Sequence, residues 1–157
     1  MRIKEIRNSD DEVIFTYDEG DEKWIWEDYD FSGVNLEKAN LQVIIWMEIK
    51  LRGGNLRKAD FYWAMLRGSD LSESDCEEAE FMGANLQEVN FTGANLKNAD
   101  FTKDKLGGST DVCGANFTDA ILDGAKFDKT RYDAKTIFPK NFKPEQNGLI
   151  RIKSPLE

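Results

Sequence analysis

The feature that most constrains this sequence is a five-residue spacing of its large apolar residues. In the stretch "GANLQEVNFTGANLKNADF", residues 83–101, these residues are Leu86, Phe91, Leu96 and Phe101. A helix repeats its buried face about every 3.6 residues and a strand about every 2. Because five steps along either element turn a side chain away from the first, no uninterrupted helix or strand keeps all four together. The backbone must therefore bend once in every five residues.

The same period runs from Phe31 to Leu106, where fourteen of sixteen central positions are Leu or Phe and the exceptions are Trp46 and Cys76. The residue two before each centre is usually Ala or Ser, and the residue directly before it is usually Asp or Asn. Asp and Asn favour bends because their short side chains bond to the nearby backbone. Repeats of this regularity predict a solenoid, with successive coils about 4.8 Å apart.

The repeats "ANLQ", "ANLK", "ADF" and "ANF" resemble the A-(D/N)-L-x-x motif of the pentapeptide-repeat family. The segment "YDAKTIFPKNFKPEQNGLI" resembles the closing segment of many of its cyanobacterial members. The resemblance implies an all-β fold, a right-handed quadrilateral β-helix with one pentapeptide on each of its four sides. The twenty-residue spacing of Phe61, Phe81 and Phe101 agrees with four bends per coil. Four inward columns are then expected: Phe31/Leu51/Leu71/Phe91, Leu36/Leu56/Cys76/Leu96, Leu41/Phe61/Phe81/Phe101 and Trp46/Leu66/Leu86/Leu106.

The period is interrupted once, after Leu106. The next centres are expected at Val112, Phe117, Leu122, Phe127, Tyr132 and Ile137, a phase that requires one inserted residue. Gly107 and Gly108 permit the positive φ that an extra residue usually needs, so the sequence predicts a bulge at a corner. The alternative is a binding loop like those of gyrase-binding members, for which a single residue is too short.

Both ends of a solenoid need covers, because the last coil exposes unpaired backbone and core side chains. Residues 1–28 are predicted to form an N-terminal capping hairpin, two strands around the polar turn "NSDDE", with Trp24 and Trp26 over the first coil. Residues 29–138 are predicted to form the β-helix, and residues 139–157 an extended C-terminal cap or tail. There Pro139 and Pro144 are expected to stop strand pairing, and Phe138 and Phe142 to cover the core.

Catalytic chemistry is not indicated by the residues present. The chain has no histidine, the commonest general base and metal ligand. Cys76 lies at a core centre, and Cys113, expected to be exposed, has no base at a suitable spacing. An acidic band lacks the pattern of a calcium loop, so a solvated surface is favoured over a metal site. The band consists of Glu73, Asp75, Glu77, Glu78 and Glu80. We expect no enzyme activity, no cofactor and no metal.

Apolar residues break the polar outward pattern in two successive coils. The stretches "LQVIIWMEIKL" and "FYWAML" place aromatic, aliphatic and methionine side chains at outward or corner positions of one edge. The residues are Val43, Ile45, Met47, Tyr62, Trp63, Met65 and Met82. A contiguous patch of this kind is typical of a covered surface or a binding site. The N-terminal hairpin folded back over it and a partner or self-association surface are the two interpretations.

Charge separates the functional alternatives. The net charge is −9, of which residues 1–30 carry −7, with four Lys/Arg against eleven Asp/Glu, and the remainder only −2. The favoured function is a non-enzymatic protein-interaction scaffold. The alternative is a DNA-mimic binder of DNA gyrase, resembling the quinolone-resistance members, which carry long acidic faces; a cation-binding surface ranks lower.

The expected partner is an unidentified protein. We expect no direct binding to nucleic acid, since an acidic chain repels phosphate, and no association with a membrane. The oligomeric state is expected to be a monomer or weak homodimer. The cysteine content and the polar N-terminus indicate the cytoplasm.

Overall fold

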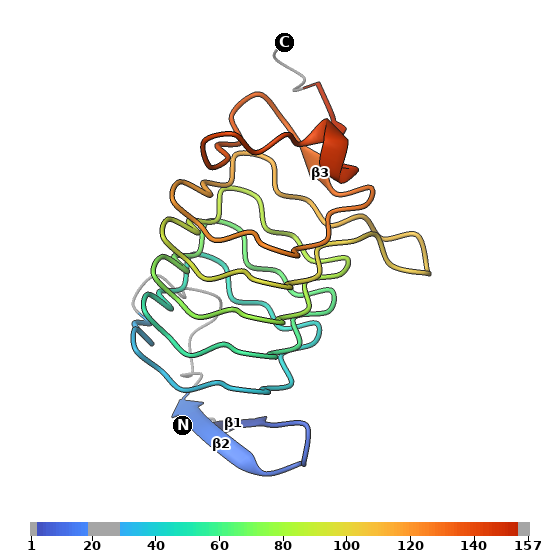
Figure 1. Ribbon diagram of the computed structural model, residues 1–157. Coiled ribbons are helices and arrows are strands. Elements are labelled where there is room, and N and C mark those ends of the chain that lie inside the picture. The colour runs from blue at the N-terminus through green and yellow to red at the C-terminus, as the bar shows by residue number, and fades with distance from the viewer. Residues whose placement is uncertain (1–2, 19–28, 154–157) are drawn as a thin grey trace.

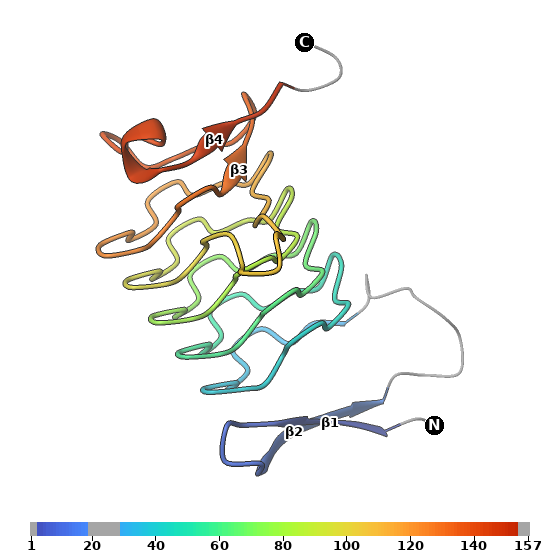
Figure 2. The same ribbon diagram turned by 90° about the vertical axis from the view of Figure 1, so that its right-hand side faces the viewer.

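The computed structural model describes residues 3–18 and 29–153, so the predicted positions of Trp24 and Trp26 lie outside the described residues. The described chain forms a solenoid of stacked coils with a hairpin at its N-terminal end (Figures 1 and 2). The hairpin consists of β1 (Ile3–Arg7) and β2 (Val13–Asp18). Near the C-terminus lie β3 (Arg131–Tyr132), the 3-10 helix η1 (Glu145–Asn147) and β4 (Ile150–Arg151).

Each five-residue unit is a tight turn followed by a single bridge residue. After the centre Leu56, the amide of Ala59 donates to the carbonyl of Leu56 at 3.1 Å, and Lys58 has a φ of 56°. A positive φ at the third residue of a turn is typical of type II. Where Asp or Asn precedes the centre, its side chain fixes the bend, as when Asp60 Oδ1 accepts the Tyr62 amide at 2.9 Å.

The coils pair in parallel at a spacing of twenty residues, as in the bridges Asp30↔Lys50, Lys50↔Asp70 and Asp70↔Asn90. Each coil therefore contains four five-residue units. Inside, Phe61, Phe81 and Phe101 stack with ring centroids 5.0 and 4.9 Å apart, which confirms the predicted column. The chain is thus a β-helical solenoid whose core is filled by the Leu and Phe centres and the small residues two before them.

The predicted one-residue bulge and the core position of Leu106 are wrong. Asn85 pairs with Asp111, twenty-six residues on instead of twenty, so six extra residues lie between these coils. The side chain of Leu106 is 83% exposed, and Val112 takes its place in the core. The extra residues form a loop that projects from the solenoid at the right of Figure 1.

The last predicted centre, Ile137, is also wrong by one residue. Asn116 pairs with Ile137, whose side chain is 51% exposed, and Phe138 stacks on Phe117 at 5.5 Å. Phe142 lies edge-on to Phe127 at 5.5 Å. The prediction that Phe138 and Phe142 cover the core is therefore confirmed.

Strand pairing does not stop at the prolines, contrary to the prediction. Pro144 is the N-cap residue of η1, and the chain then reverses at Gly148, whose φ is 81°. It returns to the solenoid as β4, which pairs in parallel with β3. Proline has no amide hydrogen, but a later segment without proline can still add to the open edge of the last coil.

The two predicted strands around the "NSDDE" turn are confirmed as β1 and β2, which pair antiparallel. The hairpin joins the first coil through hydrogen bonds, from Ser9 N to the Lys38 carbonyl at 3.0 Å and from Asn40 N to the Arg7 carbonyl at 2.7 Å. Phe15 packs edge-on against Phe31 at 4.9 Å. The hairpin therefore lies at the N-terminal end of the core.

Candidate functional site

The apolar residues singled out in the sequence lie together along one edge of the solenoid. Tyr62 and Trp63 form a turn directly above Gln42 and Val43, since the Val43 amide donates to the Tyr62 carbonyl at 2.8 Å, and Ile45 bridges to Met65. We call this surface the apolar edge; it consists of Val43, Ile45, Met47, Tyr62, Trp63, Met65 and Met82. Val43 is 68% exposed, and Ile45, Met47, Trp63 and Met65 are exposed too. Tyr62 and Met82 are half-buried.

The described N-terminal hairpin does not cover the apolar edge. Its contacts with the solenoid include Phe31, Lys38 and Asn40, at the end of the core. Five side chains of the apolar edge remain exposed beside it. The described hairpin therefore leaves these five side chains exposed, and the interpretation that the N-terminal segment covers the patch stays a prediction, since residues 19–28 lie outside the described residues.

A loop lies above the stacked turns that contain Val43 and Trp63, and it continues the apolar edge. Residues 102–110, which we call the edge loop, leave the core after Phe101, two coils above Phe61 and the Tyr62–Trp63 turn. The loop closes on itself through Asp104, whose amide donates to the Gly108 carbonyl at 2.9 Å and whose Oδ1 accepts the Gly108 amide at 2.5 Å. Leu106 lies at its exposed end.

Asp104 also ties the edge loop to the apolar edge. Its Oδ2 accepts hydrogen bonds from the Tyr62 hydroxyl at 3.0 Å and the Trp63 Nε1 at 2.5 Å. Burial alone raises the pKa of Asp104, but hydrogen bonds from Trp63 and the Gly108 amide outweigh it, so the pKa lies below the ordinary 3.8. Burial and the neighbouring carboxylate raise the pKa of Tyr62, so its hydroxyl remains a donor.

The indole of Trp63 is wedged between two glycines. A Cβ at Gly83 would lie 2.8 Å from the Trp63 Nε1, and a Cβ at Gly108 would lie 2.6 Å from its Cζ2. Both contacts are closer than side chains tolerate, so the absence of side chains at these positions is what admits the ring. Trp63 therefore has two roles, since it is 42% exposed and also holds the loop.

The acidic band is largely neutralised by a basic row on the preceding coil. Arg52 pairs with Glu73 at 2.8 Å, and Lys58 with Glu78 at 3.5 Å. Arg57 pairs with Asp75 at 3.3 Å and also with Glu77. Among the described residues no cation forms an ion pair with Glu80, which stacks between Asp60 and Asp100. Burial, and then the charges of these two residues, raise its pKa. The band is a row of ion pairs more than an acidic face.

Metal and nucleophile chemistry have little support in the geometry. Across residues 3–18 and 29–153, no three His, Cys, Asp or Glu side chains are placed to hold a metal ion. Cys76 is fully buried, as predicted, and burial raises its pKa to about 12. Cys113, expected to be exposed, is half-buried, and burial together with Asp111 raises its pKa. Both thiols therefore stay protonated at neutral pH.

No helix in the described part of the chain is both long and apolar enough to cross a bilayer.

The family model for pentapeptide repeats matches eight copies, over residues 47–75 and 66–102. A pentapeptide repeat protein from the Arabidopsis thaliana thylakoid lumen is 39% identical over 60% of this chain and 65% of its own, with a TM-score of 0.48. A pentapeptide repeat protein from Nostoc PCC 7120 is 32% identical over 78% of this chain and 84% of its own, with a TM-score of 0.34.

The cyanobacterial protein Rfr23 from Cyanothece 51142 is 23% identical over 70% of this chain and 88% of its own, with a TM-score of 0.48. None of the curated proteins matches the sequence significantly. The repeat units match the family model, and the sequence is 32% identical to the Nostoc pentapeptide repeat protein. The chain belongs to the pentapeptide-repeat family.

Proposed function

We propose that this protein is a non-enzymatic interaction scaffold that binds a protein partner through the apolar edge. The observation that carries the proposal is the exposure of five apolar side chains on successive coils, at positions where the rest of the repeat is polar. Large apolar side chains clustered on a rigid surface are typical of a binding site. The right-handed quadrilateral form of the β-helix, and the hairpin as its N-terminal cap, belong to the same proposal. The twenty-residue pairing supports the first, and the contact of Phe15 with Phe31 supports the second.

Preorganisation supports this function. Backbone pairing between coils fixes the main chain of Ile45 and Met65, and a hydrogen bond to Asp104 holds the Trp63 indole. A partner that binds such a surface has little main-chain ordering to impose, which lowers the entropic cost of association.

The alternative function, mimicry of DNA toward gyrase, is not favoured by the surface. A DNA mimic needs unpaired carboxylates in a phosphate-like row, whereas the acidic band is paired with Arg52, Arg57 and Lys58. The cytoplasm remains the proposed location.

A capture experiment from lysate of the native source tests the proposal. The double variant Ile45→Glu/Met65→Glu places charges on the apolar edge without touching the core. Ile121→Glu is the matched control, because Ile121 has the same bridge position on another column and is 48% exposed. The wild type and the control should retain a protein that the double variant loses. Equal recovery by all three folded proteins would show that the apolar edge is not the binding surface.

A further inference from the structure

The edge loop holds two exposed lysines beside the apolar edge. Lys103 and Lys105 flank Asp104, whose carboxylate accepts a hydrogen bond from the Trp63 indole at 2.5 Å. The carboxylate therefore turns inward and does not cancel the lysines on the surface. In the described part of the chain neither lysine forms an ion pair. Leu106, which follows them, is 83% exposed, so the loop presents two ammonium groups beside an isobutyl group.

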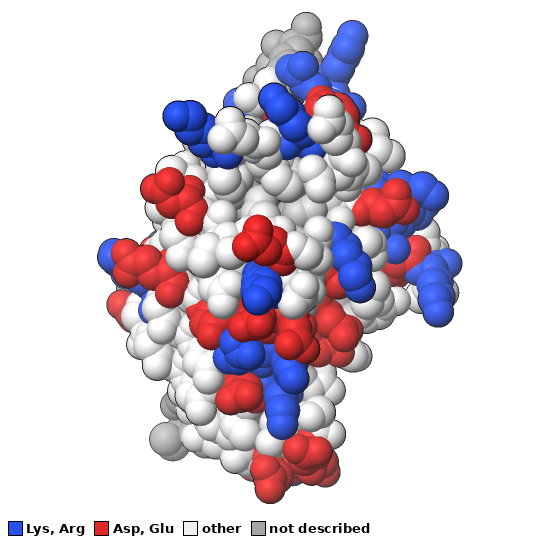
Figure 3. Space-filling view, viewed as in Figure 1, with Lys and Arg blue, Asp and Glu red and all other residues white. Residues whose placement is uncertain are grey.

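The base of the edge loop rests on the turns below it. The Gly83 amide donates to Thr110 Oγ1 at 2.9 Å, one coil above the turn that contains Trp63. The loop leaves the core two coils above Met65, which is roughly 10 Å at about 4.8 Å per coil. An extended chain covers this distance in about three residues. Figure 3 shows basic side chains on the projecting loop at the right.

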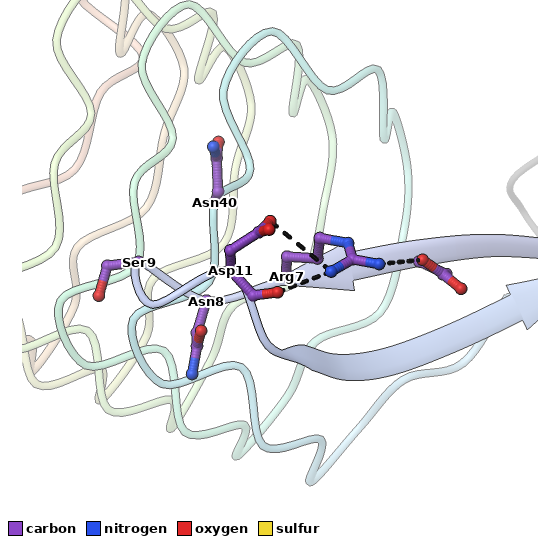
Figure 4. A pocket seen from close by; sticks show the side chains of 6 residues that line it. Arg7, Asn8, Ser9, Asp11 and Asn40 are labelled. Carbon is purple, nitrogen blue, oxygen red and sulfur yellow. Dashed lines mark hydrogen bonds and ion pairs between the residues drawn. The ribbon is translucent and has the colours of Figure 1, made fainter.

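The turns and bridges of the apolar edge below the loop carry no charge. Asp, Glu, Lys and Arg do not occur in residues 42–47, 62–65 and 82–85. Arg67, on the neighbouring column of turns, is engaged by Glu88 at 3.1 Å. At the N-terminal end of the molecule Arg7 is engaged by Glu5 at 2.8 Å and by Asp11 at 3.6 Å, as Figure 4 shows. The two loop lysines differ from these arginines in being available to a partner.

Carboxylates on the opposite flank restrict where an acidic group can lie. Asp60 and Glu80 are bridge residues that stack one above the other, directly before the turns that lead to the bridge residues Met65 and Asn85. They repel a bound carboxylate from that flank, whereas the loop lysines attract it at the upper end of the apolar edge. Charge therefore determines the orientation of an acidic partner on this surface.

We propose that the apolar edge and the edge loop together bind an acidic, apolar segment of another protein. Its apolar side chains contact Trp63 and Met65, and two carboxylates within about three residues of them pair with Lys103 and Lys105. Apolar contacts at the centre and complementary charges at the rim are typical of specific interfaces. The Asp104 hydrogen bond presents the indole and the lysines as one unit. The proposal rests on the proposed function and states the chemistry of the partner.

Selection from a random peptide display library at low salt tests this charge preference. The reversed variant is Lys103→Glu/Lys105→Glu, and the neutral variant is Lys103→Gln/Lys105→Gln. The control, Lys97→Glu/Lys140→Glu, makes the same change in net charge as the reversed variant at exposed lysines away from the edge loop. Circular dichroism first shows that each variant is folded. Fluorescence anisotropy then measures the affinity of each protein for one peptide that the wild type selects.

The wild type and the control should select peptides in which apolar residues lie near Asp or Glu. The reversed variant should select Lys or Arg in their place, a switch that misfolding cannot produce. The neutral variant should bind the wild-type peptide about tenfold more weakly, since two exposed ion pairs are lost, and salt should reduce this difference.

Three results would overturn the proposal. They are acidic peptides selected equally by the reversed variant, no peptide selected by the wild type, and a wild type that self-associates through the apolar edge and excludes peptides. Apolar peptides without a charge preference would overturn it as well. If the Ile45→Glu/Met65→Glu variant fails to select those apolar peptides, the proposed function remains intact.

Discussion

The Nε1 of Trp63 donates a hydrogen bond to Asp104 Oδ2 at 2.5 Å, across forty-one positions of sequence. This contact joins a turn of the second coil to a loop that leaves the core two coils later. Two aromatic residues of the surface, Tyr62 and Trp63, thereby become the anchor of the edge loop. The apolar edge and the loop form a single unit, and a change in one should be detected in the other.

The Asp104→Ala variant should release the edge loop. It removes the acceptor of the Tyr62 and Trp63 hydrogen bonds and of the Gly108 amide. We expect the Gly108 amide to exchange its hydrogen about tenfold faster or more, while the amides that pair one coil with the next are little affected. Hydrogen exchange followed by mass spectrometry measures both regions, and unchanged loop protection would contradict the anchoring role.

Acid should loosen the same loop in the wild type. The pKa of Asp104 is lowered in the folded protein, so its stabilising contribution is present above the ordinary value of 3.8 and is lost as the pH falls through the folded value. Trp63 fluorescence should therefore report a transition below pH 3.8. The Asp104→Ala variant should lack this transition, and its persistence there would assign it to another group.

Two glycine substitutions separate backbone strain from the fit of the indole. Gly53 has a φ of 64° and Gly83 a φ of 72°, but only a Cβ at Gly83 would collide with Trp63. Gly53→Ala should cost about 1 kcal/mol from the positive φ alone. Gly83→Ala should cost clearly more in urea unfolding and should also shift the Trp63 emission. Equal costs would mean that the indole moves aside freely.

Val43→Asn should stabilise the fold. Val43 has a φ of 52°, which is unfavourable for a β-branched side chain, and Asn98 already occupies the same turn position at 58°. The gain expected in urea unfolding is about 1 kcal/mol. Because Val43 is 68% exposed, little packing is lost. The same substitution should weaken binding at the apolar edge. A loss of stability would contradict the claim that the backbone of Val43 is strained.

The stacked carboxylates around Glu80 predict that stability falls as the pH rises, which is opposite to the effect expected of Asp104. Burial, and then Asp60 and Asp100, raise the pKa of Glu80 above 4.5. A raised carboxyl pKa means that stability is highest when Glu80 is protonated and declines as the pH rises through the folded value. Glu80→Gln should remove this decline and add on the order of 0.5 kcal/mol at neutral pH. Thermal melts from pH 4.5 upward measure the difference, and parallel curves for both proteins would contradict it.

The regular coils could be predicted because local chemistry determines them. Each Asp or Asn before a centre bonds to the amide two residues later, as Asp70 does with Ser72 at 3.0 Å, so each of these bends is fixed within its own unit. Once the bends are fixed, each Leu or Phe centre can point only into the core. The apolar edge was predicted by the same reasoning, since Ile45 and Met65 occupy bridge positions that are usually polar.

The edge loop could not be predicted from the repeat phase. Insertions of one residue and of six residues shift a five-residue period equally, so the downstream centres agree with either. Leu106 favours the insertion of one residue, which is wrong, because it falls five residues after Phe101. The pattern "STDV", with small residues and Asp111 before Val112, was the available signal that a unit restarts. The role of Asp104 depends on residues about forty positions away, which no local pattern contains.

Site-specific photocrosslinking tests most directly whether the apolar edge is a binding surface. A photoreactive amino acid replaces Met65 in one protein and Ile121 in another, since both side chains are exposed bridge positions on different columns. After irradiation in native lysate, the proposed function predicts a discrete protein adduct at position 65, whether to another protein or to a second copy, and none at position 121. Equal crosslinking at both positions, or none at either, would contradict it.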